Sequence, residues 1–560
     1  MYLGNDLFLS MFEFIRYAVG MQDFIFTPKD DTWLKNRGYL HLTKKWNTQI
    51  KRREIYSKVQ DSSFVQKHAF FPLLHAIIKE RKYKKHPQTQ ERGHVHKLTD
   101  EFSVKHKQTA KNRPLHYATH IDALIFSFYA AWLIDLYEKK LKENWELSQS
   151  IIAYRRIPQS EKILKGKSTI HFANEAFKEI KKRSVNGCAV LMFDIESFFS
   201  SLDHTRLKGA WAKLLNRPMP SGEIWKTLPA DHYNVFKACT QFNYILKDDL
   251  RLKRIKHGRR AGFDEEKLAS IRKQYGIEAF FANPAQLRAA INTKRIRVFS
   301  KQFVDKDTGK QVGIPQGLPI SAILANLYLL DFDLSIITTL VNERNCYYRR
   351  YSDDILIICK PEEKEEINKI VQEKISQVNL KISKHKTETF EFQQSKSLKG
   401  KPLTYLGFEY NGLEIFVKSA NLARFYRRMI YAVKRKAERA VKISVASGTK
   451  PIIFKSRLVK LYKRVDLDSE RDKPFKIKRL VKEDNGNYVY RRPEAEPKNA
   501  ERNKMEDNKT KKSNYISYMR RATNTIDSEK IFGQIKKRKV IFHEAMSKHV
   551  KRLVNKYKNI

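Results

Sequence analysis

Cysteine is scarce in this chain, which has four cysteines among its 560 residues. None of the four forms a Cys-x-x-Cys pair, so neither a zinc ribbon nor a disulfide framework is expected. Cys188, Cys346 and Cys359 stand beside short apolar runs, where a small thiol packs well in a core. Unpaired cysteines are typical of a reducing compartment, and we therefore expect a cytoplasmic protein.

Long hydrophobic runs are also missing. The most apolar stretch, 123–134, is too short to cross a bilayer and continues into Asp135. We therefore expect a buried helix there and no membrane partner. The first residues, 1–6, do not lead from a basic segment into an apolar one, and no signal peptide is expected.

Acidic residues are too few to balance the basic ones. Asp and Glu total 61 against 111 Lys and Arg, which gives a formal net charge of +50. An enzyme that acts on small metabolites does not need such a large positive charge. A positively charged cleft, in contrast, binds nucleic acid, because binding releases counterions from the phosphates. The 12% of aromatic residues indicates a folded protein whose rings could stack on bases. A chain of this length is expected to form about two to four domains.

The most informative motif is Tyr-Ser-Asp-Asp at 351–354, in which two carboxylates are adjacent. Apolar β-formers follow at 355–358 and Tyr348 precedes, which predicts a hairpin with the aspartates at its turn. Only a turn lets two adjacent carboxylates share one site, because neighbouring side chains on a strand point to opposite faces. Two like charges held together are costly unless a cation lies between them, and Mg²⁺ prefers carboxylate oxygen.

A third carboxylate, Asp194, ends the apolar run 188–193, which predicts a buried strand. An acid at that position needs a charged partner or a metal, or it caps the following helix. It precedes Asp353 by 353 − 194 = 159 residues, enough for a compact catalytic subdomain. Three acids from two elements could hold two divalent ions for an in-line displacement at phosphorus. Glu196 and Asp203 are expected to face solvent instead.

These motifs resemble those of reverse transcriptases. Phe-Asp-Ile-Glu-Ser-Phe-Phe at 193–199 is similar to the first palm motif, and 351–354 to the third. The second, fourth and fifth motifs resemble 313–328, 380–388 and 403–408, with Ser383 where many relatives have asparagine. The resemblance implies an α+β fold: a right-hand polymerase with fingers and palm of reverse-transcriptase type and an α-helical thumb or C-terminal domain.

The resemblance also implies roles for single residues at the catalytic centre. Asp194, Asp353 and Asp354 would bind two Mg²⁺ ions, with Mn²⁺ as an alternative, and the Ile195 carbonyl would add a ligand. Phe199 would lie under the sugar of the dNTP and leave no room for a 2′-hydroxyl.

Further roles are implied around that centre. Lys386 would protonate the departing pyrophosphate, unless it is an ordinary surface lysine. Arg155 and Arg156 would clamp phosphate, unless each pairs with an acid for structural reasons. The remaining implied contacts are Gln316 and Gly317 with the dNTP, and Leu406 and Gly407 in the primer grip.

The expected domains follow from composition and periodicity. They are a helical basic N-terminal extension at 1–110, fingers at 111–185, a palm at 186–415 with a charged insertion near 245–300, and an α-helical thumb or accessory domain at 416–560. Within the last, 421–441 and 531–557 read as amphipathic and 498–514 as a linker. The acids of Asp331-Phe-Asp333 are expected to cap a helix or face solvent.

Residues 153–156 (Ala-Tyr-Arg-Arg) and 166–168 (Gly-Lys-Ser) are similar to the fingers of bacterial abortive-infection and defence-associated reverse transcriptases. That likeness implies an RNA template, for which a dedicated non-coding RNA is one candidate, together with a DNA product and a role against phage. Three alternatives stay open. They are a retroelement enzyme of the group II intron kind, an RNA-binding scaffold that no longer catalyses, and untemplated or tyrosine-primed synthesis (Tyr515, Tyr518, Tyr557). A homo-oligomer also stays open.

Overall fold

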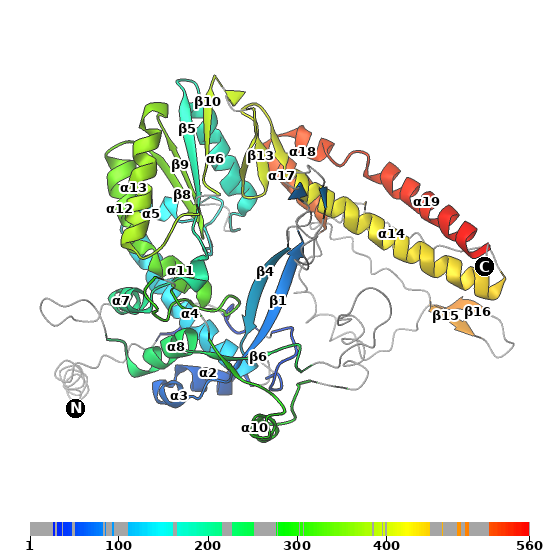
Figure 1. Ribbon diagram of the computed structural model, residues 1–560, viewed down its shortest axis with the longest axis horizontal. Helices are drawn as coiled ribbons and strands as arrows, with labels where there is room; N and C mark the ends of the chain where they lie inside the picture. The colour runs from blue at the N-terminus through cyan, green and yellow to red at the C-terminus, as the bar shows by residue number, and fades with distance from the viewer. Residues whose placement is uncertain are drawn as a thin grey trace, which may run out of the picture. The chain divides into compact units, whose positions relative to one another are not determined.

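The computed structural model of the chain (Figure 1) divides into two compact units. Unit 1 comprises Met1–Arg155 and Leu191–Glu388, and unit 2 comprises Arg156–Val190 and Thr389–Ile560. The structure describes residues 26–28, 31–35, 37–46, 51–81, 84–85, 92–93, 110–160, 165–215, 227–250, 276, 278–301, 303–305, 307–383, 386–394, 396–397, 400–448, 458, 462, 479–482, 488–491 and 514–558.

One sheet of unit 1 has the strand order β4-β1-β6-β7, with β1 at Leu73–Arg81, β4 at Ala110–Tyr117, β6 at Asn243–Leu246 and β7 at Phe299–Ser300. β1 pairs antiparallel with β4 and parallel with β6. The expected helical character of 1–110 is therefore wrong for 73–81, because long-range pairing with β4 decides its conformation. The short β2 (Lys84–Lys85) and β3 (Arg92–Gly93) form a separate antiparallel pair.

Helices cover much of unit 1. In chain order they are α2 (Arg52–Gln60), α3 (Ser62–Lys67), α4 (His120–Lys142), α5 (Trp145–Ser150), α7 (His204–Leu214), α8 (Ala230–Thr240), α10 (Pro284–Asn292), α11 (Ser321–Tyr328), α12 (Leu330–Ile336) and α13 (Lys364–Gln377). A π-helical turn, η3 (Ile337–Asn342), continues α12. In the predicted charged insertion, residues 251–275 lie outside the described part of the chain.

Helix α4 confirms the buried helix expected at 123–134. Leu124, Ile125, Phe126 and Leu133 are each at most 3% exposed. The Thr119 side chain caps its N-terminus by accepting from the Asp122 N–H, which satisfies one of the free donors of the first turn. The apolar stretch is thus the centre of a buried core, in which α4 packs against α2, α5, α7 and α11.

No single helix in the described ranges is long and apolar enough to span a membrane. One bent pair, Ser321–Tyr328 with Leu330–Asn342, reaches the required length and composition. All four cysteines are free and buried, which confirms the predicted burial of Cys188, Cys346 and Cys359 and adds Cys239.

The palm strands of unit 1 are β5 (Cys188–Asp194), which enters the unit at Leu191, β9 (Asp354–Cys359) and β8 (Tyr347–Tyr351). They are neighbours in the order β5-β9-β8. β9 is almost entirely buried, which explains its unbroken apolar sequence. Helices α12 and α13 lie beside β8 and β9 (Figure 1).

Unit 2 contains α6 (Thr169–Arg183), a pair of strands and a small three-stranded sheet. β10 (Glu388–Gln393) pairs with β11 (Lys396–Ser397), and β12 (Leu403–Tyr405), β13 (Phe408–Tyr410) and β14 (Ile415–Val417) form an antiparallel meander. A further pair is β15 (Arg479–Lys482) with β16 (Tyr488–Arg491). Residues 156–190 fall in unit 2, apart from the rest of the predicted fingers, and the four predicted domain limits remain predictions.

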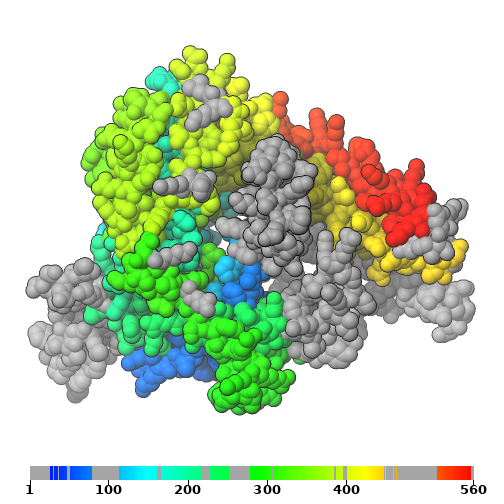
Figure 2. Space-filling view, in the orientation of Figure 1, coloured from blue at the N-terminus to red at the C-terminus, as the bar shows by residue number. Residues whose placement is uncertain are grey.

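The helices that follow in unit 2 are α14 (Ser419–Ser447), α17 (Tyr515–Ile526), α18 (Glu529–Gly533) and α19 (Arg538–Lys558). Figure 2 shows α19 (red) lying along α14 (yellow). Met429 and Val433 of α14 pack with Phe542 and Met546 of α19, so the predicted apolar stripe of 421–441 is confirmed. Arg424, Arg427, Arg428, Lys434 and Arg435 are exposed on the same helix.

The amphipathic segment 531–557 is broken between α18 and α19. The break places Gln534 at the edge of β14, where its side-chain amide donates to the Val417 carbonyl at 3.0 Å and accepts from the Val417 N–H at 2.9 Å. The predicted linker 498–514 lies outside the described residues except for Asn514, which caps α17 through the Ser517 N–H.

Three buried histidines make unit 1 sensitive to acid. Burial lowers the pKa of His41 and His120 to about 4 and that of His116 to about 3. The unfolded chain binds protons near pH 6.5 while the folded chain does not, so folding stability falls as the pH drops from 6.5 toward 4. At pH 5 each histidine contributes a loss of at most about 2 kcal/mol.

We therefore expect the urea midpoint of unfolding to be lower at pH 5 than at pH 7.5. His116 lies among Phe242 and Phe303; its Nδ1 is buried without a hydrogen-bond partner, and its Nε2 shares a hydrogen bond with Nδ1 of His75 at 3.0 Å. Phenylalanine keeps the packing of the ring but removes that hydrogen bond. The His116→Phe variant should lose part of this pH dependence. An equal drop in wild type and variant would contradict the assignment.

Candidate active site

The Tyr-Ser-Asp-Asp motif forms the predicted hairpin. β8 and β9 pair antiparallel with Tyr351 opposite Asp354, so Ser352 and Asp353 are the two turn residues. Ser352 has a φ of 61°, a left-handed conformation that two-residue hairpin turns require and that is unfavourable for a residue with a side chain. Asp353 and Asp354 are both half-buried at this tip.

The end of β5 reaches the same turn. The Ile195 N–H donates to the Asp353 carbonyl at 3.2 Å, which places Asp194 beside the hairpin tip. On the other side, the Ser383 N–H donates to the Asp194 carbonyl at 2.8 Å. The first and third motifs are thus joined by a backbone hydrogen bond, and the fourth holds the strand end from the opposite side.

Lys386 lies at this centre. Its ammonium group forms an ion pair with the Asp194 carboxylate, whose side chain is 18% exposed. The lysine is itself 51% exposed, so its role as a proton donor and the surface alternative both stay predictions. A lysine at this position can hold a positive charge or supply a proton beside Asp194.

The three carboxylates are neighbours along the backbone rather than a gathered ligand set. Among the described residues, no group of three or more His, Cys, Asp and Glu side chains lies close enough to hold a metal ion. The Asp194 side chain is turned toward Lys386 instead. Carboxylate oxygens are donors of the type that Mg²⁺ prefers, so the residue types fit such an ion although their side chains are not gathered around one point.

The sequence predicts that Glu196 and Asp203 both face solvent, and the structure confirms this for Glu196 alone. Glu196 is exposed. Asp203 caps α7 by accepting from the Arg206 N–H at 2.8 Å, and it is partly buried rather than fully solvent-facing. Neither carboxylate is needed to explain the local geometry of Asp194.

The glycine loop of the second motif packs on the residues that follow Asp194. The Gly313 N–H donates to the Leu202 carbonyl and the Ile314 N–H to the Phe199 carbonyl, both at 2.7 Å. Gly313 has a φ of 78°, and a Cβ added there would lie 2.5 Å from the Ser200 carbonyl oxygen. Phe199 lies in the 3₁₀ turn η2 (Phe198–Ser200) and is half-buried.

The same loop is held on its other side by β4. The His116 N–H donates to the Gln316 carbonyl at 2.8 Å. Gly317 has a φ of 112°, and a Cβ there would lie 2.7 Å from the His116 carbonyl oxygen. Gln316 and Gly317 are thus held against β4, and their contact with a dNTP stays a prediction.

Arg155 does not have the dNTP-binding role considered for it. Its guanidinium pairs with Glu138 through Nε and Nη2, at 2.7 and 2.8 Å, and it is 6% exposed. Nη1 donates to the Ser148 and Ile151 carbonyls, and Nη2 also reaches the Ser148 hydroxyl. All five donors of the fork are used, so the structural alternative is correct. Arg156 is exposed in unit 2, and its role stays a prediction.

The predicted primer grip forms a tight turn in unit 2. Tyr405 pairs with Phe408, so Leu406 and Gly407 are the turn residues, with φ of 46° and 91°. Two positive φ values define a type I′ hairpin, which explains the glycine. The Gly407 carbonyl accepts from the Lys418 N–H at 3.0 Å, just before α14.

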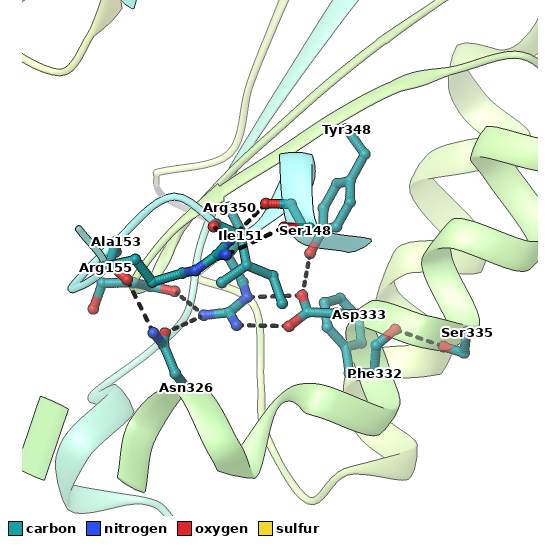
Figure 3. Close-up of polar contacts among 11 residues, drawn as sticks. Ser148, Ile151, Ala153, Arg155, Asn326, Phe332, Asp333, Ser335, Tyr348 and Arg350 are labelled. Carbon is teal, nitrogen blue, oxygen red and sulfur yellow. Dashed lines mark hydrogen bonds and ion pairs between the residues drawn. The ribbon is translucent and has the colours of Figure 1, made fainter. Parts of the chain in front are cut away.

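The expectation for Asp333 is wrong. Asp331 is exposed and pairs with Lys213, but Asp333 is fully buried and forms a two-contact ion pair with Arg350 of β8 (Figure 3). Burial alone would lower the pKa of Arg350, but the facing Asp333 carboxylate raises it above its usual range, so the guanidinium is charged. In the sequence, the only sign of this buried ion pair is an arginine directly before the Tyr-Ser-Asp-Asp motif.

Residues 270–410 match the family described as reverse transcriptase (RNA-dependent DNA polymerase). The match includes Asp353 and Asp354 and begins after Asp194. This segment thus resembles a reverse transcriptase domain, and the described part of the chain has the mixed helix and sheet of a right-hand polymerase fold.

Solved structures with partial likeness include two yeast telomerases. The apo telomerase from Candida tropicalis truncated from its C-terminal domain is 13% identical, with a TM-score of 0.32, over 56% of this chain and 54% of that one. The Candida albicans telomerase in complex with a TWJ fragment of telomeric RNA is 10% identical, with a TM-score of 0.32, over 71% and 58%. The chain thus spans little more than half the length of these proteins. No curated protein matches it.

Proposed function

We propose that the chain synthesises DNA on an RNA template by adding dNTPs to a 3′-hydroxyl, with two divalent ions held by Asp194, Asp353 and Asp354. The observation that carries the proposal is the hydrogen bond from the Ile195 N–H to the Asp353 carbonyl. It brings the acid at the end of β5 to the acids of the hairpin, inside a chain that matches a polymerase family.

Each residue of the site has a separate proposed role in the reaction. Divalent ions such as Mg²⁺, or Mn²⁺, would activate the attacking hydroxyl and stabilise the leaving oxygen when bound. Asp194 would release Lys386 in order to bind such an ion, and the Ile195 carbonyl would add an oxygen donor. Lys386, once released, is free to donate a proton to the pyrophosphate.

The direct test is primer extension by the purified chain. A DNA primer on an RNA template, dNTPs and Mg²⁺ should give full-length product, and EDTA should abolish it. The +50 charge predicts that template binding weakens steeply as salt rises. Failure to extend any primed template, with either Mg²⁺ or Mn²⁺, would contradict the proposal.

Phe199 is proposed to select the sugar. Its carbonyl is fixed by Ile314, so the aromatic side chain projects from a backbone held against the second motif. Replacing Phe199 by valine should raise rNTP incorporation relative to dNTP by about 10²-fold, because the space for a 2′-hydroxyl opens. The measurement is kcat/KM for dGTP and rGTP on one template. An unchanged ratio would remove Phe199 from the sugar pocket.

The defence role is the finer part of the proposal. It is supported by the resemblance of 153–156 and 166–168 to bacterial defence-associated enzymes, and it would include a dedicated RNA template and a cytoplasmic location. Sequencing the nucleic acid that copurifies with the chain tests it. A single defined RNA would support it, and a random mixture of cellular RNA would count against it.

Priming from the tyrosines of α17 is not favoured. The Tyr515 hydroxyl is buried without a hydrogen-bond partner, and burial raises its pKa to about 12. Burial also raises the pKa of Tyr518. A hydroxyl that is both covered and difficult to ionise is a poor nucleophile. Tyr557 lies in α19, but its side chain is not among those described.

A further inference from the structure

A fully buried ion pair lies directly behind the hairpin of the aspartates. Arg350 precedes Ser352 by two residues. The side chains of Arg350 and Asp333 are both 0% exposed. Nε and Nη2 of Arg350 donate to the two carboxylate oxygens of Asp333 at 2.8 and 2.6 Å. Tyr348 donates to the same carboxylate at 2.6 Å, so its oxygens are well satisfied.

The third nitrogen of Arg350 connects this pair to the turn. Nη1 donates to the Ser352 carbonyl and to Oδ1 of Asn326, both at 3.2 Å. Asn326, on α11, in turn donates to the Ala153 carbonyl at 2.9 Å (Figure 3). The main chain of Arg350 is held as well, because its carbonyl accepts from the Ile152 N–H at 3.1 Å.

Ser352 needs such support. A left-handed φ of 61° is costly for a residue with a Cβ and persists only where the surroundings hold it. Arg350 holds the Ser352 carbonyl from the buried side. A second contact joins the side chains, because the Tyr154 hydroxyl lies 3.1 Å from the Ser352 hydroxyl. Asp353 follows directly, so the orientation of this one peptide decides where its carboxylate points.

A buried ion pair is a poor choice for stability alone. Apolar side chains of similar size are often as stable in such a place, because two charges lose their hydration. An arginine fork, however, can bind a carboxylate with one edge and two further acceptors with the other, which no apolar residue and no lysine can do. The pair is thus suited to fixing a geometry.

We propose that Arg350, oriented by Asp333, is a positioning residue that fixes the Ser352–Asp353 turn and thereby the direction of the catalytic carboxylates. The inference rests on the proposed role of Asp353 and Asp354 in catalysis. It adds that Arg350 links three parts of the chain. Asn326 of the second motif and the segment 151–153 both contact Arg350, whose guanidinium in turn sets the geometry of the third motif.

The test uses a variant that keeps the core filled. In the full-length Asp333→Leu/Arg350→Met double variant, both charges are removed together, so no buried charge is left unpaired. We expect a melting temperature within a few degrees of wild type, a kcat for dNTP addition reduced about tenfold to a hundredfold, and a KM for dNTP changed less than about threefold. A double variant with wild-type kcat would overturn the proposal.

Arg350→Lys decides the matter if the double variant does not fold. Lysine retains the charge opposite Asp333 but cannot also bind the Ser352 and Asn326 oxygens, so kcat should fall while the protein stays folded. The matched control is Arg344→Met/Glu366→Leu, which removes an exposed two-contact ion pair in the same unit and should leave kcat unchanged. Full kcat in Arg350→Lys would count against the proposal.

Hydrogen exchange separates this inference from the proposed function. Amides of 351–355 should exchange faster in Arg350→Lys and in the double variant than in wild type or in the control, whether or not the enzyme is active. Unchanged exchange there would overturn the positioning role. A wild-type chain that extends no primer, but shows the faster exchange in the variants, would instead contradict only the proposed function.

Discussion

Replacing Asp353 and Asp354 by asparagine lowers the rate of dNTP addition by about 10³-fold or more, the largest effect that we expect from any change in the chain. Asparagine is almost the same size and suits turns, so the hairpin between β8 and β9 should keep its register. What is lost is the negative charge that divalent ions require. Single-turnover primer extension measures the loss.

The control for that experiment is Asp331→Asn. Asp331 is an exposed acid of the same unit that pairs with Lys213 on the surface, where an ion pair contributes little. It should retain wild-type activity, and circular dichroism should show all variants folded. If the Asp353/Asp354 variant kept more than about a tenth of the wild-type rate, these acids would not be metal ligands in catalysis.

Replacing Gly313 by alanine is expected to have the second largest effect. The new Cβ would lie 2.5 to 2.7 Å from three backbone atoms of Ser200, which cannot move aside as a flexible side chain would. The φ of 78° adds strain for any residue with a Cβ. Because Ser200 follows Phe199, the loop must move away from the proposed sugar-binding residue, and a shift of about 1 Å can lower kcat about 10²-fold.

Gly38→Ala is the matched control, because a Cβ there meets nothing within 4 Å and its φ is not in the left-handed region. It should leave both kcat and the urea midpoint near wild type. A Gly313→Ala variant with normal kcat would show that the second-motif loop does not need its close contact with the 3₁₀ turn after β5.

The local features of the catalytic centre were predictable from the sequence. A pair of acids between β-formers implied a turn, and the register of β8 and β9 confirms it. The apolar run before Asp194 implied a buried strand, and the periodicity of 421–441 implied a helix with one apolar face. Each of these patterns depends on neighbours in the sequence, which is why it could be read there.

The errors concern partners that are distant in the sequence. Asp331 and Asp333 look alike in the sequence, and only the packing of α12 on β8 buries one and exposes the other. Two adjacent arginines likewise do not reveal that the first turns back onto Glu138 of α4. Burial decides both cases, because a buried charge must find an opposite one and is then not free for a ligand.

The central claim is that Asp194, Asp353 and Asp354 share divalent ions at the growing end of a strand. The most direct measurement is a crystal structure of the chain with primed template, dNTP and Mn²⁺, with the metal located by its anomalous signal. We expect Mn²⁺ between the three carboxylates, at about 2.1 Å from their oxygens, with Lys386 turned away from Asp194. Mn²⁺ bound elsewhere, with the Asp194–Lys386 ion pair intact beside the dNTP, would contradict the claim.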